Sequence, residues 1–229
     1  RYQVQANLKV RDMPFLMGQG LYLDSDKLEQ YDSIESVIKH GTLSVGFIGL
    51  AETLVALTGN HHGSSADAQS LGEEIVAFMR NKMDKAMEKY GLNYSLLATP
   101  AEGLSGRFVK MDRRIFGEIA GVTDKEYYTN SFHVPVSFNI SAQDKIKIEG
   151  VYHKYTNAGH ISYVEFDAPP VNNLSAVEDL IRYMKECDFG YAGINFPIDF
   201  CESCGYIGVI GTDSCPGCKK AQVRRVKKA

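Results

Sequence analysis

The sequence lacks the features that most often assign a function at sight. It contains no G-x-S-x-G, Walker or Rossmann motif, and no pair of histidines has the i, i+4 spacing with a glutamate between them. Its most apolar run, residues 43–57, is too short to span a bilayer and carries Glu52. We find no secretory signal peptide and no internal repeat. The formal net charge of −3 argues against a dominant surface for binding polyanions.

Cysteine is scarce, and its spacing is informative. The chain has five cysteines in 229 residues, and four of them form two C-x-x-C pairs, Cys201 with Cys204 and Cys215 with Cys218. Two such turns bring four thiolates to one point, which is the ligand set of a tetrahedral zinc site. Because four cysteines leave no coordination position open, the metal is expected to be structural rather than catalytic.

Other readings of these cysteines are weaker. Two disulfides would require an oxidising compartment, and nothing else in the chain suggests secretion. These motifs also differ from a thioredoxin-like redox pair, since neither C-x-x-C pair stands at the start of an expected helix. Gly205 and Gly217 are expected to relieve the tight backbone of the two turns. The fifth cysteine, Cys187, is a lone thiol on the core side of an expected helix, so the compartment is expected to be reducing.

Composition and periodicity favour a globular α/β protein. Hydrophobic residues make up 44% and charged residues 23% of the chain, as in ordinary soluble domains. Helices are expected over residues 41–57 and 64–90 and from a capping box at Ser175 and Glu178. A stripe of apolar residues spaced four apart on the second helix is expected to be core: Leu71, Ile75, Met79, Met83 and Met87. Strands are expected over residues 93–99, 160–166 and 191–195, and strands separated by helices indicate the α/β class.

The loop after the first of these strands is a candidate binding site. Its small residues leave backbone N–H groups accessible, so it is a candidate for holding phosphate, but the same letters also make an ordinary turn between strand and helix. Glu102 in this loop is a candidate acid or base and equally a helix cap. The candidate segment consists of Thr99, Pro100, Ala101, Glu102 and Gly103, in a loop expected to continue to residue 107.

Four strings in order along the chain give a more specific signal than any of these patterns. They are HGTLSVGFIGLAETLVALTGNHHG (40–63), NYSLLATPAEGLSGRF (93–108), GVTDKEYYTNSFHVPV (121–136) and TNAGHISYVE (156–165). Together with the paired C-x-x-C turns, they closely resemble the anaerobic, class III ribonucleoside-triphosphate reductases, which are glycyl radical enzymes. The resemblance extends over nearly the whole chain, to about Cys218.

The resemblance implies a fold and a division into domains. Residues 1–199 would form the C-terminal half of a ten-stranded α/β barrel, residues 200–220 a zinc module and residues 221–229 a basic tail. It also implies a set of residues that bind the substrate and a set that binds zinc. The first set is Thr99, Pro100, Ala101, Glu102, Gly103, Asn130, Ser131 and His160, and the second is Cys201, Cys204, Cys215 and Cys218.

The resemblance further implies a reaction and its partners. Members of the family reduce ribonucleoside triphosphates to deoxyribonucleotides in the cytoplasm, with a glycyl radical installed by an S-adenosylmethionine iron–sulfur activase. The glycyl radical generates a thiyl radical on a cysteine, and a homodimer is expected for the parent enzyme. Neither a membrane nor nucleic acid is expected as a partner. The reductant, formate or a thiol system, stays open.

Two departures from the family pattern concern the ends of the chain. The family's radical cysteine would lie upstream of Arg1, and the string Arg224-Arg225-Val226 is not followed by the radical glycine. We therefore expect a fragment that is inactive alone, with no catalytic residue of its own. The alternative is a zinc-ribbon module that binds nucleic acid, attached to an α/β domain. The basic tail favours that alternative, but the acidic remainder of the chain argues against it.

Overall fold

The structure is a computed structural model that describes residues 2–166, 169–196, 198–210, 212–221 and 223–224. The chain divides into two compact units, which we describe separately. One comprises Arg1–Val45 with Met79–Leu96, and the other Gly46–Phe78 with Leu97–Ala229. The expected zinc module, residues 200–220, lies within the second unit, and its status as a separate domain stays a prediction. Most of the expected basic tail, residues 222 and 225–229, lies outside the described residues.

The first unit is built from short helices around a small core. Met17, Ile34 and Val37 are buried together there. The unit also holds the first part of β1 and most of β2, which are hydrogen-bonded neighbours, and the Ser44 and Ser95 hydroxyls lie 2.9 Å apart. Its elements are α1 (Tyr2–Gln5), η1 (Val10–Asp12), α2 (Pro14–Gly18), η2 (Ser25–Lys27), α3 (Glu35–Ile38), β1 (Thr42–Phe47), the end of α5 (Ala66–Tyr90) and β2 (Asn93–Ala98).

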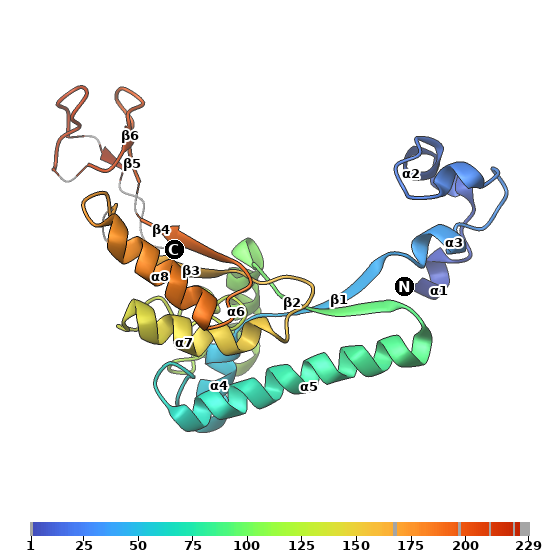
Figure 1. Cartoon of the computed structure of the whole chain (residues 1–229), viewed down its shortest axis with the longest axis horizontal. Coiled ribbons are helices and arrows are strands. Elements are labelled where there is room, and N and C mark those ends of the chain that lie inside the picture. Colours follow the sequence, from blue (N-terminus) through green and yellow to red (C-terminus); the bar gives the residue numbers. More distant parts are fainter. Residues whose placement is uncertain (1, 167–168, 197, 211, 222, 225–229) are drawn as a thin grey trace. The chain divides into compact units, whose positions relative to one another are not determined.

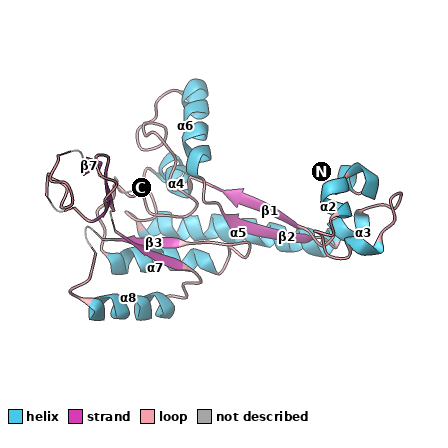
Figure 2. Ribbon diagram, turned by 90° about the horizontal axis from the view of Figure 1, so that it is seen from above, coloured by secondary structure: helices cyan, strands magenta, loops and turns pink. Residues whose placement is uncertain are grey.

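The second unit contains the larger core and the paired strands of the α/β class. Its parallel pair β3–β4 is in register at Ser162 with Ala192, and α8 connects the two strands (Figure 2). Helix α7 contacts both β3 and α8 (Figure 1). The elements are α4 (Leu50–Thr58), the start of α5, α6 (Glu102–Phe116), α7 (Ala142–His153), β3 (Ser162–Glu165), α8 (Leu174–Glu186), β4 (Ala192–Asn195), β5 (Asp199–Cys201), β6 (Ile207–Gly208) and β7 (Val223–Arg224).

Apolar side chains from α7, β3 and α8 meet in the core of this unit. They are Ile146, Val164, Leu180 and Met184, and Cys187 packs against them at the C-terminal end of α8. The periodicity that placed Cys187 on the core side is therefore confirmed. A parallel bridge joins Leu97 to Gly159 and brings the loop before β3 to the end of β2.

The expected helix over residues 41–57 is wrong in its first half. Strand β1 occupies that half, and Gly49, at φ 76°, makes the left-handed junction to α4. Gly46 has a packing role, because a Cβ there would overlap the hydroxyl oxygen of Thr99. β-branched and aromatic residues at Thr42, Val45 and Phe47 are compatible with a strand, and pairing with β2 fixes the strand in place of the expected helix.

Three smaller expectations are also corrected. The loop expected over residues 100–107 ends early, since α6 begins at Glu102. Helix α8 begins without the expected capping box, because Asn173 is the N-cap and its side chain accepts a hydrogen bond from Ala176 N. The stripe on α5 is only half-buried, and Met87 at its end is 38% exposed. The buried positions of this helix belong to a neighbouring row, Ala68, Gly72 and Val76.

Candidate functional site

The four paired cysteines meet as the sequence predicts. Their sulfur atoms all lie within 4.8 Å of one another. Cys201 Sγ is 3.6 Å from Cys218 Sγ, and Cys204 Sγ is 3.6 Å from Cys215 Sγ, so the thiols are free and not joined as disulfides. Sulfur ligands about 2.3 Å from a tetrahedral zinc ion lie about 3.8 Å apart. The donor set and its spacing therefore fit one tetrahedral metal ion.

The two cysteine turns have the same backbone design. In each turn the first cysteine donates its N–H to the carbonyl five residues later, and its own carbonyl accepts from the N–H four residues later. That fourth residue has a positive φ in both turns, 73° at Gly205 and 62° at Lys219. The expectation for Gly205 is confirmed, whereas in the second turn Lys219 takes the left-handed position expected for Gly217. Gly217 instead donates its N–H to Cys215 Sγ over 3.3 Å.

Four thiols this close favour a cation among them. A backbone hydrogen bond at Tyr206 lowers the pKa of the Cys204 thiol, but loss of water and hydrogen bonds with the other three thiols raise it to about 12. Metal ions bind the thiolate rather than the thiol. A divalent cation at the centre would offset part of the charge of the four thiolates, and its binding would be coupled to the ordering of these turns.

The candidate phosphate segment lies between β2 and α6. Thr99, Pro100 and Ala101 form the connection, and Glu102 and Gly103 belong to the first turn of α6. The N–H of Ala101 is already occupied, because it donates to Asn130 Oδ1 over 3.1 Å. Two candidate segments that are about 30 residues apart in the sequence therefore meet at the start of α6.

A third candidate segment reaches the same end of β2. Ala98 N donates to Gly159 O over 3.0 Å, which places the loop before His160 beside the candidate phosphate segment. His160 Nδ1 lies 3.0 Å from Thr156 O. Since a carbonyl only accepts, Nδ1 carries the proton. The family resemblance implies that these three segments share one site, and in the structure their backbones lie close together.

The ring of His160 packs on that of His153, with centroids 4.2 Å apart. His153 Nδ1 accepts from Gly190 N over 3.0 Å, so its Nε2 donates to Ser162 Oγ, also over 3.0 Å. Burial and the neighbouring His160 lower the pKa of His153 to about 3, which keeps this ring neutral at physiological pH. The contacts of His160 within the protein give its ring a fixed position.

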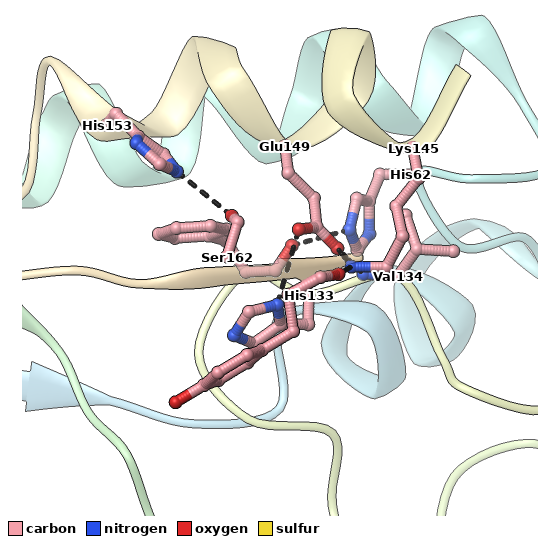
Figure 3. Close-up of polar contacts among 9 residues, drawn as sticks. His62, His133, Val134, Lys145, Glu149, His153 and Ser162 are labelled. Carbon is pink, nitrogen blue, oxygen red and sulfur yellow. Dashed lines mark hydrogen bonds and ion pairs between the residues drawn. The ribbon is translucent and has the colours of Figure 1, made fainter. Parts of the chain in front are cut away.

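A buried charge cluster around Glu149 was missed by the sequence analysis. Glu149 is buried, and its carboxylate lies 2.6 Å from Lys145 Nζ, 3.3 Å from His133 Nδ1 and 2.9 Å from Val134 N (Figure 3). Lys145 Nζ also donates to Tyr163 O over 2.8 Å. Burial raises the pKa of Glu149, but His133 and Lys145 outweigh it and lower the pKa to about 2. The cluster ties the segment after residue 131 to α7 and β3.

His62 lies beside this cluster (Figure 3). Its Nε2 donates to Phe132 O over 2.8 Å, and burial lowers its pKa to about 4. Glu52 is a second buried carboxylate that the sequence analysis did not assign to a site. A single acidic residue inside an apolar run was the available signal for Glu52, and the i, i+4 spacing of Lys145 and Glu149 was the signal for the cluster.

Comparison with known proteins gives the family. A family model described as anaerobic ribonucleoside-triphosphate reductase matches residues 1–228. The chain belongs to this family. It is 37% identical over 227 residues to the anaerobic ribonucleoside-triphosphate reductases of Salmonella typhimurium and Escherichia coli, covering 96% of this chain and 31% of each relative. The reductase of Enterobacteria phage T4 is 37% identical over 200 residues, which cover 86% of this chain and 31% of the relative. The chain thus spans about a third of the length of these relatives.

Solved structures agree on the fold. An anaerobic ribonucleotide reductase superposes with a TM-score of 0.69 at 20% identity, covering 94% of this chain and 33% of the solved chain. The Thermotoga maritima enzyme in complex with dATP and CTP gives a TM-score of 0.68 at 20% identity over 94% of this chain and 34% of that one. These neighbours confirm the α/β class. In the part of the chain that the structure describes, no helix is long and apolar enough to cross a membrane.

Proposed function

We propose that the chain forms part of an anaerobic ribonucleoside-triphosphate reductase and binds the phosphates of the substrate at the start of α6. The observation that supports this most strongly is the meeting of three segments at the end of β2. Residues 99–103 follow that strand, Asn130 binds Ala101, and Gly159 pairs with Leu97. Sites formed by loops at the ends of strands are the usual binding places in α/β folds.

The start of α6 has the chemistry of an anion site. The N–H groups of Glu102, Gly103 and Leu104 lie in the first turn of a 15-residue helix. In that turn the helix itself provides no carbonyl to accept a hydrogen bond from them. The helix dipole adds partial positive charge at the same end. Asn130 Oδ1 is held by Ala101 N–H, which leaves the NH₂ group of Asn130 as a further donor.

A basic hollow continues from this point along α6. Its volume is about 550 Å³, and Gly103 lies at its N-terminal end. Arg107, Lys110 and Arg114 line it and supply cationic groups suited to a triphosphate. Two other candidate residues, Thr99 and Ser131, hold the surrounding backbone in place. Thr99 packs on Gly46, and the carbonyl of Ser131 accepts a hydrogen bond from Leu50 N.

The remaining parts of the reaction are proposed from the family. A glycyl radical, installed by an S-adenosylmethionine iron–sulfur activase in the cytoplasm, would supply the radical chemistry. The residues of this chain would bind and orient the ribonucleotide, with the loop of His160 at the edge of the site. We further propose that the parent enzyme is a homodimer and that this chain contributes half of its ten-stranded barrel.

We propose zinc as the metal of the four-cysteine cluster. Thiolate ligands in a closed tetrahedral set select zinc in a site without redox function. Cys201, Cys204, Cys215 and Cys218 would hold the ion, and its role would be to order residues 200–220. So short a segment has little core of its own, and the ion would supply the missing stability.

A Gly103→Val substitution tests the phosphate site. A Cβ at position 103 meets nothing within 4 Å beyond its chain neighbours and the backbone of its own helix, and valine is at least as favourable as glycine in a helix, so stability should be unchanged. The added side chain should cover the first-turn amides and weaken CTP binding about tenfold or more, as expected for the loss of a hydrogen bond to a charged group. Isothermal titration calorimetry and thermal unfolding measure both properties on the same variant.

Gly18→Val is the matched control, because position 18 is also open and lies in the other unit. This variant should keep the CTP affinity of the unchanged chain. If folded Gly103→Val protein binds CTP as tightly as the unchanged chain, residues 99–103 form an ordinary turn and not a phosphate site. Tight, steeply salt-dependent binding of nucleic acid in place of CTP would favour the zinc-ribbon alternative.

A further inference from the structure

Residues 128–131 are clamped between α4 and α6. On one side Gly49 N donates to Thr129 O over 2.8 Å, which supplies an acceptor at the N-terminal end of α4. On the other side the hydroxyl of Tyr128 donates to Asp112 Oδ2 of α6 over 2.8 Å. Burial first, and then Asp112, raise the pKa of Tyr128 to about 12, so this hydroxyl stays a donor.

Glu52 holds the middle of this segment. It is the third residue of α4 and is 2% exposed. Its Oε1 accepts two hydrogen bonds from one residue, 3.1 Å from Thr129 N and 2.6 Å from Thr129 Oγ1. A buried carboxylate with two donors on one oxygen fixes both the backbone and the side chain of its partner. Glu52 Oε2 is buried and has no hydrogen-bond partner among the described residues.

The clamp holds a backbone that would otherwise relax. Ser131 has a φ of 38°, which is unfavourable for a residue other than glycine. Such a conformation persists only where surrounding contacts fix it. Asn130 lies between Thr129, which Glu52 holds, and Ser131, whose carbonyl accepts from Leu50 N over 3.1 Å. Both neighbours of Asn130 are therefore fixed to α4, while its side chain binds Ala101 at the start of α6.

We propose that Glu52 is a positioning residue for the nucleotide site. By fixing Thr129, its carboxylate holds the Asn130 amide against Ala101 N–H and thereby sets the entry into α6. Glu52 itself is buried and contacts no substrate in this scheme. The effect on nucleotide binding rests on the proposed function, whereas the effect on the Ala101 amide does not.

Hydrogen exchange of single backbone amides tests the positioning role directly. In Glu52→Ala the Ala101 amide should exchange about tenfold faster or more, because its acceptor is no longer held in place. The amide of Val109, in the middle of α6, should keep its rate. Glu52→Gln retains an oxygen for Thr129 and replaces only the unpartnered Oε2, so exchange at Ala101 should stay within about threefold of the original.

Two further variants make the test independent of global stability. Thr129→Val removes only the 2.6 Å hydroxyl contact at nearly constant size, and should also speed exchange at Ala101. If Glu52→Ala does not fold, Thr129→Val alone tests the positioning role of Glu52. Glu73→Gln is the control, since Glu73 binds Lys154 and Tyr155 away from this segment and should leave Ala101 unchanged.

The affinity for CTP supplies a second readout through a double-mutant cycle. Glu52→Ala should weaken CTP binding about tenfold in the folded protein, but should cost little more in an Asn130→Ala background, because it acts through Asn130. Unchanged exchange at Ala101 in folded Glu52→Ala and Thr129→Val proteins would overturn the positioning role. Fully additive losses of affinity would also overturn it. Failure of the unsubstituted chain to bind CTP would instead refute the proposed function, and the exchange result would still decide the role of Glu52.

Discussion

Glu149→Gln removes one buried charge at nearly constant size. A pKa lowered from 4.5 to about 2 corresponds to about 3 kcal/mol of stabilisation of the ionised carboxylate in the folded chain. Breaking a buried pair by removing one partner costs about 3–5 kcal/mol in other proteins. We therefore expect urea unfolding at pH 7 to give a free energy about 3 kcal/mol lower for Glu149→Gln than for the unchanged chain.

The same pair of proteins should show a defined pH dependence. Because the folded pKa of Glu149 lies below the unfolded value, its contribution to stability is fully present above about pH 4.5 and is lost as pH falls through about 2. The difference in unfolding free energy between the two proteins should therefore shrink as the pH is lowered from 4.5. A difference that grows on acidification would contradict the assignment.

Glu73→Gln provides the matched control on stability. Glu73 also binds a lysine, Lys154, but its side chain is partly exposed to water. Exposed pairs contribute about 0–1 kcal/mol, so this variant should lose less than about 1 kcal/mol. If Glu149→Gln also loses less than about 1 kcal/mol at pH 7, the buried cluster does not stabilise the fold as we infer.

Three further outcomes are expected. Elemental analysis should find one zinc ion per chain, and Cys201→Ser should lose the ion; full zinc content in that variant would refute the site. Gly46→Ala should lower the free energy of unfolding by about 1–3 kcal/mol, and Thr99→Ala should restore part of it by removing the overlapping hydroxyl; additive losses would contradict this packing. The 229-residue chain alone, given an activase and a reductant, should form no deoxyribonucleotide, because four of its five thiols belong to the four-cysteine cluster and Cys187 packs against the core. Product formation in that assay would refute the last expectation.

Features set by local sequence were predictable. The strand at 93–99 was expected from its residues, and β2 occupies Asn93–Ala98. The same holds for β4 and for α5, which begins two residues after the expected start. The two C-x-x-C spacings predicted the cysteine cluster, although the 3.6 Å sulfur contacts, Cys201 with Cys218 and Cys204 with Cys215, join the two turns.

Features set by contacts between distant residues were not predictable in this way. The apolar run over residues 41–57 favoured one helix, but pairing with β2 makes its first half a strand. The partner of Glu52 lies 77 residues away at Thr129, and that of Ala101 lies 29 residues away at Asn130. No local pattern encodes such pairs, so a buried carboxylate in an apolar run indicates a partner without naming it.

Mapping the residues that contact the phosphates of CTP is the most direct test of the proposed site. Backbone amide shifts of the isotope-labelled chain can be followed by NMR during titration with CTP. We predict saturable shifts that are largest at the amides of Glu102, Gly103 and Leu104 and at the side-chain NH₂ of Asn130. Shifts confined to other segments, or none at saturating CTP, would contradict a phosphate site at the start of α6.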